Sequence, residues 1–179
     1  PCSASCRCSP SWVLRLSFAG LVSRDVLGRA DRDRRGARGD ALDEAVLGRS
    51  VPVLGVCVGT QMMAKSSDEG RLAGLGWIDA HVARFDLEDS HRYPQPHMGW
   101  NDVQPRSASC IFRAMQSPRF YFLHTYHVVV EREDDILATA DYGGLFTAAV
   151  RKGNILGTQF HPEKSHQWGI DLLRNFSEL

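Results

Sequence analysis

Residues 51–61 place a cysteine between two glycines directly after an apolar run. The run at 51–56 is rich in β-branched residues, which predicts a short buried strand. Cys57 follows it with Gly55 and Gly59 on either side, and a helix is predicted to begin near Gln61. A strand, a glycine-flanked nucleophile and a helix form a nucleophile elbow, and the predicted helix start favours a thiolate. The alternative is a core cysteine beside a tight turn.

The composition limits the classes of protein to consider. The 179 residues carry 21 basic and 21 acidic side chains, so no long-range field favours nucleic acid or an anionic membrane. No run of 18 apolar residues is present, so no membrane-spanning segment is predicted. Five irregularly spaced cysteines argue against a disulfide framework, and Cys57 and Cys110 fit a reducing, cytoplasmic setting.

Residues 1–40 differ from the rest of the chain. The first fifty residues contain nine arginines, no lysine and three of the five cysteines, and the chain does not begin with Met. We interpret 1–40 as an atypical segment that is disordered or translated from a shifted reading frame. A transit peptide is one alternative, and a metal site at Cys2, Cys6 and Cys8 is another, although no matching second half follows.

Residues 41–179 predict a single α/β domain. Turn signals separate apolar segments of strand and helix length, and Lys152-Gly-Asn154 marks a hairpin. The strands are expected to form a mostly central sheet. Helices are predicted over 40–47, with Asp40 as the N-cap, and over 167–178, with Ile170, Leu172, Leu173 and Phe176 on one face. A helical turn or two is predicted over 110–115, and strands are predicted over 51–56, 75–85, 98–103, 119–130, 136–140, 145–150 and 155–160.

A second candidate cluster follows the last predicted strand, at His161-Pro-Glu163. In an extended segment, residues i and i+2 point to the same side, so His161 and Glu163 are expected to share a face. An imidazole exchanges a proton with a thiol nucleophile, while a carboxylate holds the other ring nitrogen. The alternative is a loop histidine beside surface charges.

The remaining histidines do not predict a metal site. His124 and His127 are three residues apart on a predicted strand, where they would face opposite sides. We therefore expect no metal and no cofactor.

Six segments together resemble the class I, triad-type glutamine amidotransferases, and within them the glutaminase subunits of imidazole glycerol phosphate synthase. The resemblance covers about residues 41–179 and implies a three-layer, flavodoxin-like α/β fold. Its specific motifs are the elbow with His-Pro-Glu and the segment His-Met-Gly-Trp-Asn. The matching segments are 52–61, 67–70, 96–101, 121–126, 157–165 and 172–176.

The resemblance implies a role for individual residues. Cys57 would attack the amide carbon of glutamine, His161 would move the proton and Glu163 would orient His161. The implied glutamine-binding residues, with Val58 N–H as an oxyanion donor, are Val58, Gly59, Gln61, Thr125 and Tyr126. Thr125 stands where the family usually has Ser.

The resemblance also implies a partner. In the family, ammonia passes to a (β/α)8 cyclase subunit that makes imidazole glycerol phosphate in histidine biosynthesis, so a cytoplasmic heterodimer is expected. The residues implied to face that partner are His97, Met98, Gly99, Trp100, Asn101 and Lys164.

One departure leaves alternatives open. The family opens with a first βα unit and a Pro-Gly-Val-Gly loop that donates a second oxyanion N–H, and neither is found in this sequence, so this N-terminal unit is predicted to be degenerate or missing. The chain is therefore either an active glutaminase subunit or a catalytically impaired binding subunit. A paralogous amidotransferase for surface-polysaccharide sugar amidation is a further alternative.

Overall fold

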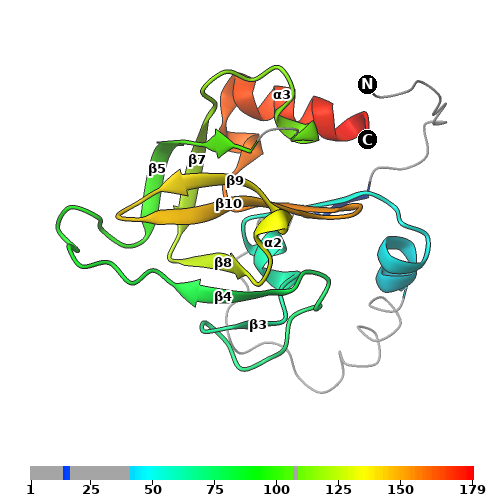
Figure 1. Ribbon diagram of the computed structural model, residues 1–179, viewed down its shortest axis with the longest axis horizontal. Helices are drawn as coiled ribbons and strands as arrows, with labels where there is room; N and C mark the ends of the chain where they lie inside the picture. The colour runs from blue at the N-terminus through cyan, green and yellow to red at the C-terminus, as the bar shows by residue number, and fades with distance from the viewer. Residues whose placement is uncertain (1–13, 17–40, 107–108) are drawn as a thin grey trace.

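The computed structural model describes residues 14–16, 41–106 and 109–179 (Figure 1). The predicted domain boundary at residue 40, the helix cap at Asp40 and the N-terminal cysteine cluster lie outside these residues. They stay predictions.

A six-stranded sheet crosses the middle of the molecule in the order β1-β2-β11-β10-β9-β6. Strand β2 pairs in parallel with β1 and β11, and the other pairs are antiparallel. The two neighbours of β2 therefore end at the same edge of the sheet as β2 itself. The strands are β1 (Leu14–Leu16), β2 (Val53–Val56), β6 (Gln104–Pro105), β9 (Ile136–Asp141), β10 (Leu145–Lys152) and β11 (Ile155–Thr158).

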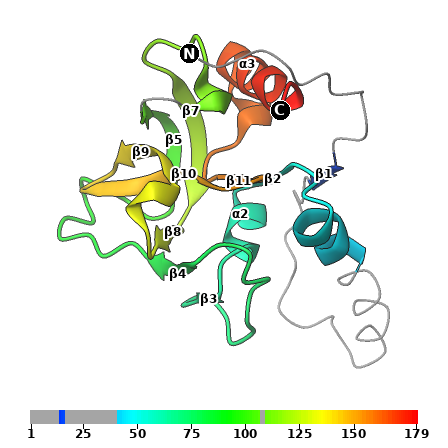
Figure 2. The same ribbon diagram turned by 45° about the vertical axis from the view of Figure 1, so that its right-hand side comes forward.

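Two smaller sheets accompany the central one. Strand β4 lies between β3 and β8 in the first, and β5 pairs antiparallel with β7 in the second. Figure 2 shows β3, β4 and β8 on one side of the central strands. The strands are β3 (Ser66–Ser67), β4 (Ala80–Arg84), β5 (His97–Asp102), β7 (Arg119–His124) and β8 (Tyr126–Val130).

Helices complete the layers. The C-terminal helix α3 (His166–Ser177) covers the side of the central sheet opposite to β4 and β8, and α2 (Val58–Met62) lies on the side of β4 and β8 (Figure 2). This arrangement is the α/β three-layer fold that was predicted. Short helical turns are η2 (Glu44–Gly48), η3 (Cys110–Phe112), η4 (Glu133–Asp135) and η5 (Pro162–Lys164).

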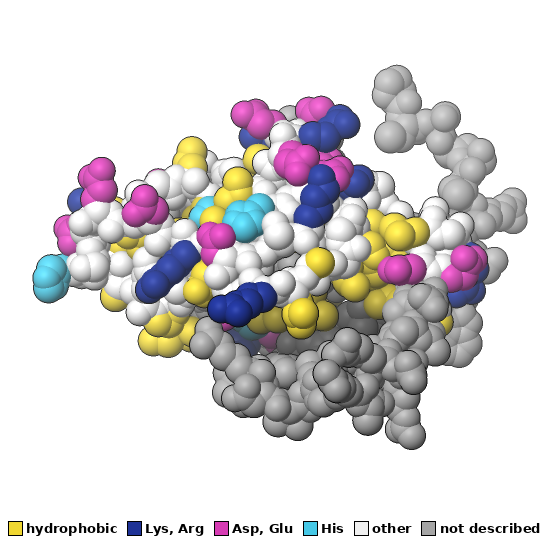
Figure 3. Space-filling model, turned by 90° about the horizontal axis from the view of Figure 1, so that it is seen from below, with side chains coloured by type: hydrophobic (Ala, Val, Ile, Leu, Met, Phe, Trp, Pro, Cys, Tyr) yellow, Lys and Arg dark blue, Asp and Glu magenta, His cyan; other side chains and the backbone are white. Residues whose placement is uncertain are grey.

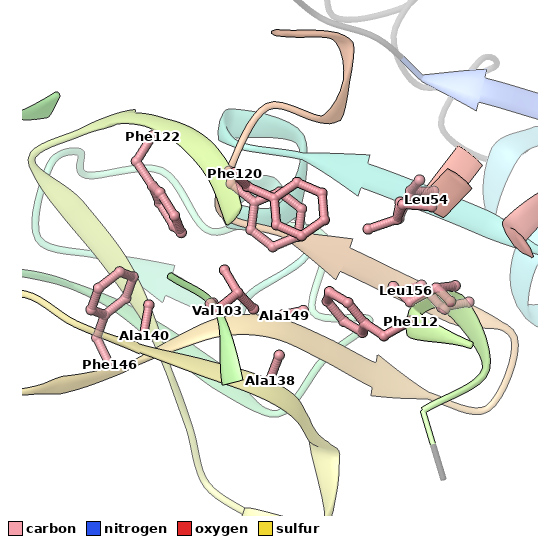
Figure 4. Packing of buried hydrophobic residues seen from close by; sticks show 14 of the residues in the cluster. Leu54, Val103, Phe112, Phe120, Phe122, Ala138, Ala140, Phe146, Ala149 and Leu156 are labelled. Carbon is pink, nitrogen blue, oxygen red and sulfur yellow. The ribbon is translucent and has the colours of Figure 1, made fainter. Parts of the chain in front are cut away.

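The core has two parts, one on each face of the central sheet. Successive side chains of β2 point to opposite faces of the sheet, so Leu54 packs in the hydrophobic cluster on one face and Val53 packs in the cluster on the other. Phe120 and Phe160 stack with ring centroids 4.0 Å apart in the first cluster. Figure 4 shows Phe120 and other side chains of this cluster packed between the strands.

Three predicted elements differ from the structure. The strand predicted over 75–85 occupies only β4, and the strand predicted over 119–130 is divided into β7 and β8 at Thr125. The division lets one apolar stretch enter two different sheets. Ile170, predicted on the buried face of the last helix, is 54% exposed, whereas Leu172 and Phe176 are buried.

Charged side chains of both signs are interspersed on the described part of the face shown in Figure 3. In the part of the chain that the structure describes, no helix has the length and hydropathy needed to cross a membrane.

Candidate active site

Cys57 forms the sharp turn between β2 and α2. Its backbone has φ 50° and ψ −108°, a conformation that is strained for a residue with a side chain. Its N–H donates to Thr158 O at 2.7 Å, which ties the turn to the end of β11. The predicted nucleophile elbow is thus present, with the helix beginning at Val58 rather than near Gln61.

Two glycines allow α2 to pack against the strands. A Cβ on Gly55 would lie 2.8 Å from Thr60 N, and one on Gly157 would lie 2.4 Å from Thr60 Cγ2. Thr60 Oγ1 lies 2.9 Å from Gly55 O and 2.8 Å from Thr158 O. The close approach made possible by the glycines therefore places this hydroxyl between the two strand ends.

The Cys57 thiol is buried, with 7% of the residue exposed. Its Sγ lies 3.7 Å from Gln159 Nε2 and 3.7 Å from Leu123 O. Burial raises the pKa of the Cys57 thiol to about 11, and the Val58 N–H opposes that rise only in part. The expectation of a thiolate is therefore wrong, because loss of water outweighs the helix start.

His161 and Glu163 form a hydrogen-bonded pair. His161 Nδ1 lies 2.7 Å from Glu163 Oε1, and His161 N donates to Tyr121 O at 2.8 Å. The predicted contact is present, but the reason given for it was wrong. Residues 162–164 form the helical turn η5 instead of an extended segment, and this turn brings the carboxylate back to the ring.

The structure brings these three side chains to one edge of the central sheet. Strands β2 and β11 are parallel neighbours with Val56 opposite Thr158, so Cys57 and His161 follow strand ends that lie together. The charge of Glu163 also raises the pKa of the Cys57 thiol. Among the described residues His161 Nε2 is buried without a hydrogen-bond partner, so this nitrogen is available on the side away from the carboxylate.

Of the predicted glutamine-binding residues, Val58 contacts the thiol through its N–H, and the Gln61 side chain is linked to the thiol through Gln159. Gln61 Nε2 donates to Tyr126 O at 2.8 Å and lies 3.3 Å from Gln159 Oε1. Val58 and Gly59 lie in the first turn of α2, and Thr125 and Tyr126 follow β7. Val58 and Gly59 therefore follow Cys57 directly in the chain, and Tyr126 is linked to this region through Gln61.

Gln159 was not predicted as a site residue. It is 1% exposed, and its amide bridges the Cys57 sulfur and the Gln61 side chain. The only signal in the sequence was a polar residue at the end of an apolar strand, two positions before His161. That pattern also fits a surface loop, so the role becomes visible only in three dimensions.

The predicted partner-facing residues divide between two sides of β5. Met98 and Trp100 are 65% and 41% exposed, and Trp100 stacks on His166 with ring centroids 5.4 Å apart. Lys164 Nζ lies 5.8 Å from the ring centroid of Tyr121. These side chains share one outer surface beside His161, because Trp100 pairs with Tyr121 across the strands.

The inner side of β5 was predicted less well. His97 is 3% exposed and Asn101 is half-buried, so His97 points into the protein rather than towards a partner. Strand alternation explains the difference, since residues 98 and 100 take the outer face. Gly99 lies between them with φ 132°, in the region that favours glycine.

His124 and His127 do not face opposite sides of one strand, so the predicted reason against a metal there was wrong. Both rings contact Phe85, at centroid distances of 5.2 and 4.6 Å, because the chain breaks between β7 and β8. Within 14–16, 41–106 and 109–179, no three His, Cys, Asp or Glu side chains are grouped to hold a metal ion.

Comparison with known proteins identifies the family. The model of the class I glutamine amidotransferases matches residues 32–178. The chain belongs to the class I glutamine amidotransferase family. It is 49% identical over 142 residues to the imidazole glycerol phosphate synthase subunit HisH of Leptospira interrogans, covering 78% of this chain and 70% of that protein. It is 48% identical over 141 residues to subunit HisH 2 of Pseudomonas aeruginosa, covering 78% and 69%.

Solved structures show the same amidotransferase fold. The chain superposes on a glutamine amidotransferase from Thermotoga maritima with a TM-score of 0.51, at 20% identity and over 85% of this chain and 59% of that one. It superposes on PurLQS from Thermotoga maritima with a TM-score of 0.58, at 17% identity and over 83% and 73%. At these identities the likeness concerns the fold alone.

Proposed function

We propose that this chain is the glutaminase subunit of an imidazole glycerol phosphate synthase. It hydrolyses glutamine to glutamate and ammonia, and it supplies the ammonia to a (β/α)8 cyclase subunit in histidine biosynthesis. The observation that carries the proposal is that Cys57 and the hydrogen-bonded His161–Glu163 pair follow the neighbouring ends of two parallel strands, β2 and β11. The identity of 49% to a HisH subunit supports the choice of pathway.

The first half of the reaction releases ammonia. Because the Cys57 thiol has a pKa of about 11, it needs a base, and we assign that role to His161 Nε2, which has no hydrogen-bond partner among the described residues and follows the strand next to that of Cys57. As the proton moves to His161, the sulfur attacks the side-chain amide carbon of glutamine. The tetrahedral intermediate then collapses, His161 gives the proton to the leaving nitrogen, and ammonia departs from a glutamyl thioester.

The second half restores the enzyme. Water attacks the thioester carbon while His161 accepts a proton from it, and collapse of the intermediate breaks the carbon–sulfur bond. The proton returns to sulfur, and glutamate leaves. In both halves Glu163 accepts a hydrogen bond from His161 Nδ1–H, which keeps Nε2 available as the base. The Val58 N–H donates to the oxyanion.

The surroundings of the thiol suit glutamine as the substrate. Amide side chains of Gln61 and Gln159 lie beside Cys57, and they can donate to and accept from a primary amide or a carboxylate. Ammonia is expected to leave towards the outer surface of β5 and β7, which adjoins His161 through the Tyr121 contact. We propose that the cyclase subunit binds to this surface.

The test is a reconstitution with the cyclase subunit and its nucleotide substrate. Wild-type chain is expected to support glutamine-dependent formation of imidazole glycerol phosphate, and Cys57→Ala is expected to support none. Ammonium chloride bypasses the glutaminase step, so it should restore product formation with Cys57→Ala. Glutamine-dependent activity in that variant would remove Cys57 from its proposed role.

The same assay separates the alternatives. A sugar-amidating paralogue would release ammonia only with a different synthase partner and would make no imidazole glycerol phosphate here. An impaired binding subunit would bind the cyclase subunit but yield product only with ammonium chloride.

A further inference from the structure

A chain of hydrogen bonds leads inward from β5. Asn101 Nδ2 lies 3.4 Å from His97 Nε2, His97 Nδ1 lies 3.2 Å from His124 Nε2, and His124 Nδ1 lies 2.9 Å from Tyr126 O. His97 and His124 are also opposite each other in the register of β5 and β7. The two imidazoles therefore connect a strand with an exposed outer face to the backbone after β7.

One set of proton positions satisfies every contact. The Tyr126 carbonyl only accepts, so His124 Nδ1 carries its hydrogen and Nε2 accepts from His97 Nδ1–H. His97 Nε2 then accepts from the Asn101 amide. Burial lowers the pKa of His97 to about 4 and that of His124 to about 3, so both rings are neutral at pH 7, as this arrangement requires.

The series of hydrogen bonds continues to Cys57, the proposed nucleophile. Tyr126 O also accepts from Gln61 Nε2 at 2.8 Å, and Gln61 Nε2 lies 3.3 Å from Gln159 Oε1. Gln159 Nε2 in turn lies 3.7 Å from Cys57 Sγ. These contacts link the Tyr126 carbonyl to the Cys57 thiol through two amide side chains.

Packing holds the first imidazole in place. The His97 ring lies between Tyr142 and Phe122, with centroid distances of 3.9 and 4.8 Å and interplanar angles of 23° and 21°. A ring held on both faces keeps its hydrogen bonds in one direction. A shift of β5 would therefore move the donor to His124 with it.

We propose that His97 and His124 are positioning residues for glutamine, which hold the Tyr126 carbonyl so that Gln61 and Gln159 are oriented beside Cys57. Through them, the position of β5 sets how well the site receives the substrate. The proposal rests on the proposed function, because it assigns the glutamine-binding side of that site. Neither histidine touches the reacting atoms.

The experiment compares two labelling rates at Cys57 by peptide mass spectrometry. A chloroketone analogue of glutamine reports the oriented site, and iodoacetamide reports only the reactivity and exposure of the thiol. His97→Phe keeps the stacking but removes the donor to His124. We expect the rate at which the chloroketone labels Cys57 in this variant to fall about tenfold, because one buried hydrogen bond is lost. The rate of labelling by iodoacetamide should stay within about twofold of wild type.

Two variants control the result. His97→Asn places an amide nitrogen near the position of Nδ1, so it should restore chloroketone labelling to within about threefold of wild type. Tyr142→Phe keeps the ring against His97 and loses only the hydroxyl bond to Pro94 O, so it should label like wild type. If His97→Phe does not fold, His97→Gln replaces it, because its longer side chain leaves His124 Nε2 without a donor.

Each outcome decides one proposal. Equal chloroketone labelling of wild type and His97→Phe, or no recovery in His97→Asn, would overturn the positioning role while leaving the glutaminase function intact. A wild-type chain that reacts with iodoacetamide but not with the chloroketone would overturn the glutamine site itself, and the inference with it.

Discussion

At the scale of single residues, the buried thiol of Cys57 makes a prediction about pH. With a pKa of about 11, the thiolate fraction at pH 7 is roughly one in ten thousand. Because the thiolate is the nucleophile and its fraction grows as pH approaches the pKa, alkylation of Cys57 by iodoacetamide should rise about tenfold per pH unit from pH 7 to 9.5. Peptide mass spectrometry distinguishes Cys57 from the other cysteines, and a plateau below pH 8.5 would contradict the effect of burial on this pKa.

The His161–Glu163 pair makes a second prediction at this scale. Glu163→Gln can donate to His161 Nδ1, which would place the ring proton on Nε2 and remove the base. Glutamine hydrolysis with the cyclase subunit present should fall by about 10³–10⁴ in kcat, with little change in KM. Glu133→Gln is the matched control, because that carboxylate is 88% exposed and lies 3.8 Å from Arg106 Nη2 in a surface ion pair. A loss below about tenfold in Glu163→Gln would refute the orienting role.

Sequence patterns supplied the three residues of the proposed triad but not the residues that surround them. Cys57 and His161 stand in short, characteristic motifs at strand ends. At such positions the neighbouring residues in the sequence determine the backbone turn that presents the side chain. Gln159 and His124 gain their roles from burial and from neighbours 102 and 27 residues away in the chain. No local pattern distinguishes such residues from ordinary strand positions.

At the scale of elements, the packing of α2 on β2 predicts the cost of adding one methyl group. Gly55→Ala would place a Cβ 2.8 Å from Thr60 N and 2.9 Å from Gly59 C, and backbone atoms cannot easily move away. We expect a loss of about 1–3 kcal/mol in the free energy of unfolding, measured by denaturant titration. Gly70→Ala, where no atom lies within 4 Å of the new Cβ, should change it by less than about 0.5 kcal/mol. Equal effects of the two substitutions would show that the elbow is not tightly packed.

Most predicted elements were confirmed, and the misses have physical causes. The hairpin of β10 and β11 is confirmed, with Gly153 at φ 62° in its turn. The stretch 119–130 was wrong as one strand because apolar and β-branched residues continue through Thr125, and periodicity does not show which sheet each half joins. In the structure β7 pairs with β5, and β8 pairs with β4, so the two halves of the stretch join different sheets.

At the scale of the whole molecule, the outer face of β5 and β7 predicts where the cyclase subunit binds. Met98 and its cross-strand partner Leu123 are 65% and 37% exposed, next to Trp100. Met98→Glu should raise the Kd for the cyclase subunit at least about tenfold without lowering the melting temperature, as judged by calorimetry. Leu145→Glu changes a similarly exposed apolar residue on β10 and should leave the Kd unchanged. Similar affinities of the two variants would place the interface elsewhere.

The family and the layered fold were predicted from motifs spread over the last 139 residues, and the comparisons confirm both. The N-terminal part was harder, because residues 25–40 show no apolar period and residues 1–40 as a whole were interpreted as an atypical segment. The structure describes only β1 there, whose backbone pairs in parallel with β2 over three residues. The edge of β2 is thus covered along that length, although no pattern in residues 14–16 had predicted a strand.

The glutamyl thioester on Cys57 is the intermediate that the proposed function requires. The direct measurement is acid quenching of the chain with glutamine, the cyclase subunit and its ligand, followed by mass spectrometry of the Cys57 peptide. We predict one added glutamyl group on that peptide in the wild-type chain, and none in Cys57→Ala, which lacks the sulfur that forms the thioester. Glutamate formed at the wild-type rate by Cys57→Ala, with no modified peptide in wild type, would contradict catalysis through Cys57.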